Sequence, residues 1–282
     1  MNGLRRSTKI GGRNHICAAR IKKDERTHQP MNGNNIPLLL ITTNDRKFDH
    51  LRYLSHHNNL TQNHDVMLAQ VPWEYQEIQS DNMDLLLSEA IQREIFDSIR
   101  NSFFMIEQTS VFFDAMNREG PGQYFKKWWN TKSDEDLNLM FSRDPGATIE
   151  SGLALNIPDH DPVISTNTQR GKINMDGEIR EENKRYSWLS SDDFNLYFIP
   201  EGATKVYNEM EISEFLEYDF RKPNFDKICE KIGEYSAIVK TEMTPDSIRT
   251  VVESNIEDII YKDTESFGKS AGDPEQTSLD NL

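Results

Sequence analysis

Apolar runs alternate along the chain with stretches in which apolar residues recur every three or four positions. The first run, IPLLLIT at residues 36–42, predicts a buried strand. In the stretch that follows, NDRKFDHLRYLSHH at 44–57, Phe48, Leu51 and Leu54 share one helical face. The folded part of the chain therefore begins with a strand, a polar turn and a helix.

The same two patterns continue toward the C-terminus. They predict helices over residues 84–99, 124–130, 134–141 and 225–238, and strands over 103–106, 147–157 and 194–200. A polar group follows the strand at 103–106, as is typical of a strand that ends at a functional site: Glu107, Gln108, Thr109 and Ser110. Strands that alternate with helices indicate an α/β fold.

Composition limits the classes of partner. The chain has 282 residues, 36% of them hydrophobic, which is enough to build the core of one large domain. Its first 30 residues hold eight Lys or Arg and two acidic residues, which gives them a charge of +6. Since the net charge of the whole chain is −15, residues 31–282 carry a charge of −21. A body this acidic repels phosphate backbones, which argues against nucleic acid as a partner. An anionic ligand has to be held by local cations in a defined pocket.

Cysteine use and hydropathy bear on the compartment. Cys17 and Cys229 are the only cysteines, without a CxxC spacing, which is typical of a soluble protein in a reducing compartment such as the cytoplasm. The longest apolar run near the start is LLLI, so we expect no membrane span. The basic N-terminus lacks the apolar segment of a signal peptide.

Four segments are expected. Residues 1–35 lack periodicity and predict a basic, disordered arm, or upstream sequence before a start at Met31. Residues 36–240 form the folded domain. An extra amphipathic helix is expected at 241–262, with Thr244 as N-cap and Pro245 in its first turn, either packed on its own domain or docking a partner. Residues 263–282 read as a disordered polar tail.

Short polar motifs accompany the predicted strands. TTNDRK at 42–47 joins the first strand to its helix, where backbone amides and Lys47 can meet a phosphate. Further motifs are WEYQ at 73–76, EQT at 107–109, PGQYFK at 121–126, the glycine turn of RGKI at 170–173 and the strand ending in FIP at 198–200. In this order and spacing they resemble the inosine triphosphate pyrophosphatase family, which converts deaminated purine triphosphates to monophosphate and pyrophosphate.

The resemblance implies a two-lobed α/β fold over residues 36–240, with a long mixed sheet, a nucleotide cleft between the lobes, magnesium as cofactor and a homodimer. Matched position by position, it implies the nucleotide-binding residues Thr42, Asn44, Lys47, Lys126, Phe194, Asn195, Phe220 and Arg221, and the metal-binding residues Glu74 and Glu107. The lysines would balance the triphosphate charge, and Phe194 would stack on the purine. Arg221 can donate to the 6-oxo group of hypoxanthine but not to the amino group of adenine.

Two departures from the family pattern fall at the reacting end. Gln108 occupies the position of a carboxylate that helps to hold magnesium and activate water, and an amide can neither carry charge nor take up a proton. Phe215 occupies the position of a phosphate-facing lysine. Two explanations would leave pyrophosphatase activity intact: the match between this sequence and the family motif is shifted by one residue, or Glu107 acts as the general base in place of residue 108.

Retained binding with impaired chemistry favours a degenerate pyrophosphatase that acts as a nucleotide sensor. The hypothesis is that dITP or ITP binds with little or no hydrolysis and regulates a partner effector, for example an NAD-consuming enzyme in bacterial anti-phage defence. The alternatives are an active pyrophosphatase on ITP, dITP or XTP, and a scaffold that binds no nucleotide.

Overall fold

The protein is described from a computed structural model, which covers residues 36–73, 75, 80, 82–175, 183, 186–189 and 194–236. The side chains of Glu94, Ile95, Ser187 and Phe194 are outside this description. The predicted basic arm (1–35), the extra helix (241–262) and the polar tail (263–282) also lie outside the described residues, so those predictions stay open.

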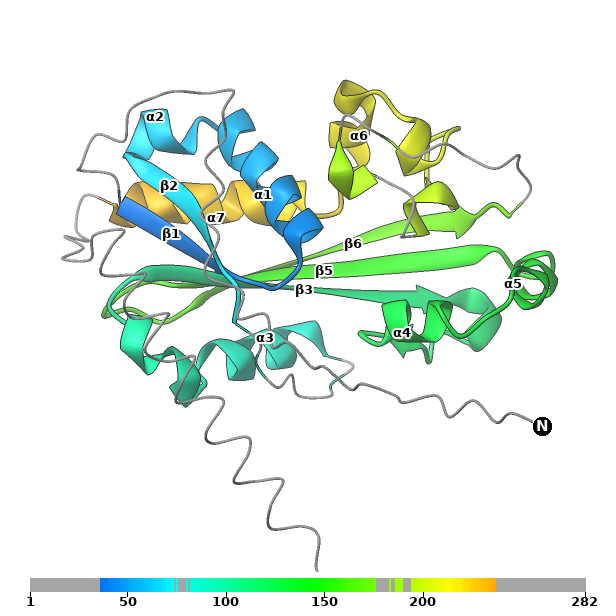
Figure 1. Cartoon of the computed structure of the whole chain (residues 1–282), viewed down its shortest axis with the longest axis horizontal. Helices are drawn as coiled ribbons and strands as arrows, with labels where there is room; N and C mark the ends of the chain where they lie inside the picture. Colours follow the sequence, from blue (N-terminus) through cyan, green and yellow to red (C-terminus); the bar gives the residue numbers. More distant parts are fainter. Residues whose placement is uncertain are drawn as a thin grey trace, which may run out of the picture.

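Seven strands in the described residues form one mixed sheet, which confirms the α/β prediction (Figure 1). Its order is β2-β1-β3-β5-β6-β7, and β4 pairs with β3. β1 is parallel to β2 and β3, while the other pairs are antiparallel. The strands are β1 (Ile36–Ile41), β2 (Val66–Val71), β3 (Phe103–Phe113), β4 (Pro121–Gly122), β5 (Gly146–Asn156), β6 (Val163–Ile173) and β7 (Phe198–Pro200).

Helices cover both faces of this sheet. The α-helices are α1 (Asp45–His57), α2 (Leu60–His64), α3 (Met83–Ile91), α4 (Phe125–Trp129), α5 (Asp134–Phe141), α6 (Ile212–Tyr218) and α7 (Lys222–Tyr235). Short 3₁₀ helices are η1 (Glu94–Ile99), η2 (Asp114–Met116), η3 (Ser187–Leu189), η4 (Phe194–Leu196) and η5 (Tyr207–Glu209). α1, α2 and α7 lie over one face, and α3 lies under the other (Figure 1).

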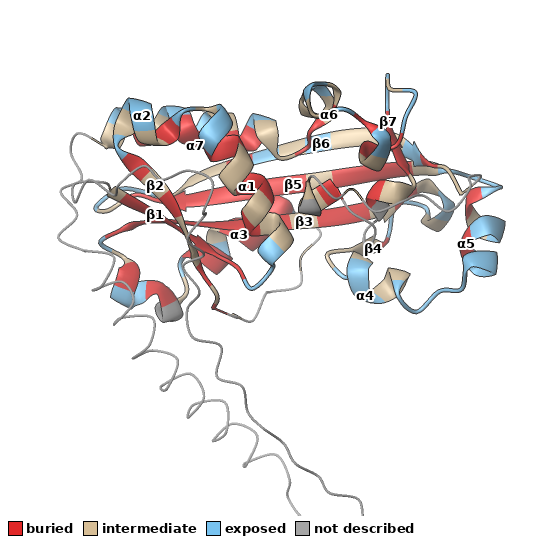
Figure 2. Ribbon diagram, turned by 45° about the horizontal axis from the view of Figure 1, so that its top comes forward, coloured by how far each residue is buried: buried red, intermediate tan, exposed pale blue. Residues whose placement is uncertain are grey.

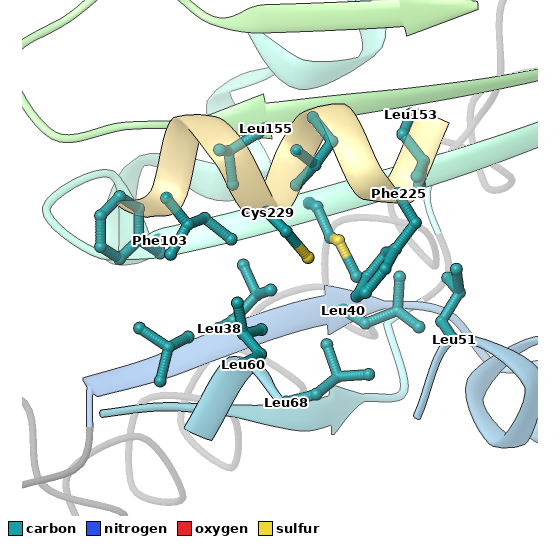
Figure 3. Close-up of a cluster of buried hydrophobic side chains, with 14 of the residues drawn as sticks. Leu38, Leu40, Leu51, Leu60, Leu68, Phe103, Leu153, Leu155, Phe225 and Cys229 are labelled. Carbon is teal, nitrogen blue, oxygen red and sulfur yellow. The ribbon is translucent and has the colours of Figure 1, made fainter. Parts of the chain in front are cut away.

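The core divides along the long strands into two lobes. At the β1–β2 end, a leucine-rich cluster packs α1 and α7 on one face of the sheet (Figure 3). A second cluster packs α3 on the opposite face. At the far end, a third cluster gathers aromatic residues from α4, α5, α6 and β7. β3 and β5 pass through both lobes and are buried along most of their length (Figure 2).

Three predicted elements differ from the structure. The strand expected at 103–106 does not end at the polar group but runs on to Phe113, because ten consecutive residues pair with β5. The helix expected over 84–99 ends at Ile91, and residues 94–99 form the separate 3₁₀ helix η1. Arg100 donates to the carbonyl oxygen of Ile91 at the helix end (2.7 Å) and to that of Arg93 in the link between the two helices (3.1 Å). The strand expected at 194–200 is confined to Phe198–Pro200.

The glycine turn expected at Gly171 is wrong as well. Gly171 lies within β6 and pairs with Pro200 of β7. A Cβ atom at this position would collide with the carbonyl oxygen of Ile199 and with the ring of Phe198. Glycine is therefore required here by the close approach of a neighbouring strand rather than by a turn.

Candidate functional site

The turn between β1 and α1 is organised by its own side chains. Asn44 is the N-cap of α1, and its Oδ1 accepts the backbone N–H of Arg46 (3.0 Å) and of Lys47 (3.1 Å). The hydroxyl of Thr42 accepts the N–H of Asn44 at 3.1 Å. Two amides expected to meet a phosphate are thus bound by Asn44.

Glu107 is the centre of a buried charged group. Its side chain is 0% exposed, and Lys47 Nζ lies 2.6 Å from its Oε2. Lys47 also donates a hydrogen bond to the backbone carbonyl of Glu107 at 2.9 Å. On the other side, Oε1 accepts from Arg221 Nε at 2.9 Å and from the Thr109 hydroxyl at 2.5 Å. One carboxylate therefore holds two cations that are far apart in the sequence, one on α1 and one at the start of α7.

These contacts decide the charge of Glu107. Burial by itself raises the pKa of the carboxyl group, but the charges of Arg221 and Lys47 and the hydrogen bonds to the carboxylate lower it more, from 4.5 to about 2. A carboxylate with this pKa is a poor acceptor of a proton near neutral pH. Glu107 is therefore unsuited to act as the general base in place of a carboxylate at position 108.

Arg221 is held at each of its three nitrogens. Besides the Nε contact with Glu107, Nη2 donates to the hydroxyl of Thr109 at 3.2 Å and Nη1 lies 3.2 Å from His50 Nδ1. The guanidinium also stacks on the ring of Phe220, with 4.5 Å between its carbon and the ring centroid. Because Arg221 and Lys47 keep 14% and 18% of their side chains exposed, the network has its solvent-facing edge at these two cations.

Gln108 points to the opposite face of the sheet from Glu107. It pairs across the strands with Gly152, where a Cβ atom would meet Leu87 and Met83 of α3, so Gln108 lies on the α3 face. Its Nε2 donates to the hydroxyl of Tyr75 at 3.0 Å. Two predicted motifs, EQT and WEYQ, therefore meet on this face. Glu74, next to Tyr75, lies outside the described residues.

Of the remaining predicted residues, Phe220 contacts the charged network, because its ring lies under the guanidinium of Arg221. Lys126 is exposed on α4, and Asn195 is buried and donates its amide to the carbonyl of Trp188 at 2.9 Å. Phe220 and Phe215 belong to the third core cluster, where Phe215 packs edge-on against Tyr207. Phe215 therefore has a packing role in the structure. The side chain of Phe194, expected under the base, is outside the description.

The described residues do not fit a magnesium ion at Glu107. In the described part of the chain, no three His, Cys, Asp or Glu side chains are grouped so that they could hold a metal. A divalent cation on Oε2 would share that atom with the ammonium of Lys47, 2.6 Å away, and cation–cation repulsion opposes this. Glu107 acts here as a counter-ion, and the metal role predicted for Glu74 is not tested.

The comparisons with known proteins agree with the architecture. The fold is a mixed α/β sheet whose core divides into two lobes. A model of the Ham1 family matches residues 38–231, more than half of the chain, so this chain belongs to the Ham1 family. The resemblance to inosine triphosphate pyrophosphatases is confirmed by this match. The family binds purine nucleoside triphosphates.

Several solved structures are similar to the chain. The Ham1 protein of Staphylococcus aureus is 16% identical, with a TM-score of 0.48, and the match covers 70% of this chain and 98% of that one. A HAM1 protein from Coxiella burnetii is 15% identical (TM-score 0.49; 71% and 99% covered). A nucleoside-triphosphatase / dITP/XTP pyrophosphatase from Mycobacterium abscessus is 18% identical (TM-score 0.42; 68% and 97% covered).

No curated protein sequence matches this chain. Among the helices that the structure describes, none is both long and apolar enough to cross a membrane.

The motif comparison overlooked one member of the charged network, His50. It lies on α1 one turn beyond Lys47 and is buried. A signal was available, because a histidine at this position belongs to the same helical stripe as the buried Leu54. His50 is paired with Asp219, whose Oδ2 lies 2.8 Å from His50 Nε2.

Proposed function

We propose that this protein binds a deaminated purine nucleoside triphosphate such as dITP or ITP, hydrolyses it slowly or not at all, and acts as a sensor. The observation that carries the proposal is the pair of partly exposed cations, Lys47 and Arg221, held together by one buried carboxylate. Two cations arranged in advance are suited to an anionic ligand, because little of their side-chain freedom remains to be lost on binding.

Ligand binding exchanges one anion for another. A phosphate group approaching Lys47 competes with Glu107, and a 6-oxo group on the base accepts from the guanidinium of Arg221. Hypoxanthine is therefore preferred over adenine, whose amino group presents donors to a side chain that only donates. Glu74 is the candidate protein ligand for a magnesium ion, which would balance part of the triphosphate charge.

The weak chemistry follows from Gln108. Its amide carries no charge, takes up no proton, and donates to Tyr75 on the face of the sheet opposite Glu107. General-base catalysis typically raises the rate of a reaction by about 10²–10⁴, so its loss would leave nucleotide binding as the main activity. An active pyrophosphatase is the second candidate, supported by the family match over residues 38–231.

The first test is calorimetric titration with dITP, ITP and dATP in the presence of magnesium, with pyrophosphate measured in the same samples. Binding of dITP without pyrophosphate release supports the sensor, whereas rapid release overturns it in favour of the enzyme. Arg221→Lys is the informative variant, since it keeps the charge and loses the planar donor pattern, and it should weaken the preference for dITP over dATP. A wild-type protein with no affinity would indicate a scaffold.

A sensor needs a partner. We propose a homodimer that regulates an effector, for example an NAD-consuming enzyme of an anti-phage system, in the cytoplasm. Light scattering that gives twice the chain mass of 32.8 kDa would support the dimer. An NAD-consuming enzyme encoded beside this protein should change its rate when dITP is added to the mixture, and an unchanged rate would remove that partner.

A further inference from the structure

His50 and Asp219 form a buried pair behind Arg221. His50 Nε2 lies 2.8 Å from Asp219 Oδ2, and their side chains are 1% and 0% exposed. The pair joins α1 to the segment just before α7. Asp219 also accepts the backbone N–H of Arg221 through Oδ1 at 2.9 Å, so it contacts the same arginine twice, once directly and once through the histidine.

The partners of His50 define its tautomer. Arg221 Nη1, 3.2 Å from His50 Nδ1, can only donate a hydrogen bond, so Nδ1 must present its lone pair. The carboxylate of Asp219 can only accept, so the proton must be on Nε2. The imidazole is thus neutral, with one nitrogen donating to Asp219 and the other accepting from Arg221.

Packing keeps the ring in this orientation. The indole of Trp188 stacks on the imidazole with 5.4 Å between ring centroids and 4° between the ring planes. Phe215 approaches at 5.5 Å in a tilted arrangement. Since apolar rings line the imidazole and its side chain is 1% exposed, a ring flip would break both polar contacts without water to replace them.

We infer that Asp219 and His50 are positioning residues that orient the guanidinium of Arg221, and thereby contribute to the choice of purine. The inference rests on the proposed function, because Arg221 reads the base there. Glu107 and Thr109 hold the Nε and Nη2 edge of the guanidinium, and His50 holds Nη1. Without the histidine acceptor, the planar group is held along one edge only and can rotate away from a base.

Asp219→Asn tests this without changing side-chain size. The amide N–H of the new asparagine can donate to Nε2 of His50, so the imidazole proton moves to Nδ1. Nδ1–H would then face the N–H groups of Arg221, and two donors cannot form a hydrogen bond. We expect dITP affinity to fall about tenfold to a hundredfold, the scale of one hydrogen bond to a charged group. His50→Leu should lower dITP affinity by the same factor. His50→Gln, whose amide offers an acceptor and a donor, should recover most of that loss.

Two further readouts separate positioning from simple packing. In the Arg221→Lys background, Asp219→Asn should cost no further dITP affinity if Asp219 acts through the guanidinium, whereas additive losses would overturn the inference. The tautomer is read independently by ¹⁵N NMR of histidine-labelled protein, with His50 assigned from its missing signal in His50→Gln. The wild type should carry the proton on Nε2, and a proton on Nδ1 would overturn the inference.

Failure of the proposed function can be distinguished from failure of the positioning role. If the wild type binds no purine triphosphate, the sensor proposal falls, and the NMR tautomer alone then decides whether Asp219 and His50 hold Arg221 as inferred. If Asp219→Asn does not fold, the comparison of His50→Leu with His50→Gln provides the affinity test. Equal dITP affinity in all folded variants would overturn the positioning role.

Discussion

Glu107 and Gln108 are neighbours in the chain, but their side chains leave β3 on opposite faces of the sheet. Glu107 points toward α1 and α7 and is bound by Lys47 and Arg221. Gln108 points toward α3 and donates to the hydroxyl of Tyr75. At these two positions the described pairing of β3 is with β5 alone, so the two side chains lie on either side of an open strand edge, and each can be changed without breaking the contacts of the other.

Gln108→Asp should raise pyrophosphate release from dITP with magnesium, because it restores a carboxylate that can accept a proton and bind a cation. General-base catalysis is worth about 10²–10⁴ in rate, and the phenylalanine at position 215 keeps the gain at the lower end of that range. The measurement is a pyrophosphate assay against the wild type. Gln108→Asn, which keeps the amide, is the matched control, and equal rates for all three proteins would contradict the prediction.

Glu107→Gln should destabilise the fold by about 3–5 kcal/mol, since it leaves Lys47 and Arg221 without their shared counter-ion. Urea unfolding at pH 7 measures this free energy of unfolding. The matched control is Glu119→Gln at an exposed position, which should stay within about 0.5 kcal/mol of the wild type. If the two variants are equally stable, the buried network contributes little.

The pKa of Glu107 predicts how stability depends on pH. The folded-state pKa of about 2 is below the ordinary 4.5, so the unfolded chain binds more protons between these values. The stabilisation is therefore fully present above about pH 4.5 and is lost as the pH falls toward 2. The free-energy difference between wild type and Glu107→Gln should narrow over this interval. Asp114, whose pKa is also lowered to about 2 by Arg170 and Arg118, is common to both proteins and cancels. A free-energy difference that stays constant between pH 4.5 and 2 would contradict the lowered pKa of Glu107.

Gly171→Ala should cost about 1–3 kcal/mol, because its Cβ atom would meet the Ile199 carbonyl and the Phe198 ring and push β7 from β6. Thermal and urea unfolding would measure the loss. Thr168→Ala, at an exposed position on the same strand, is the control and should cost much less. Similar losses in both variants would mean that the strands can separate at little cost.

Local patterns were sufficient to predict much of the fold. The predicted helix at 134–141 coincides with α5, and the strand–turn–helix at the start coincides with β1 and α1. Both depend on interactions within a few residues, namely apolar periodicity and N-caps such as Asn44 and Ser133. β2 and β6 were not predicted. β2 pairs in parallel with residues 30 positions away, and β6 has no regular apolar alternation, because only Ser165 and Ile173 of its residues are buried.

The candidate site divides in the same way. The sequence by itself determined the family and the presence of Lys47, Glu107, Gln108 and Arg221, since these depend on residue identity and order. Only the tertiary structure decided that Glu107 is a counter-ion and that His50 joins Asp219 to Arg221. The physical reason is that a hydrogen bond between residues 169 positions apart, such as that between His50 and Asp219, depends on how helices pack on the sheet, which no local pattern records.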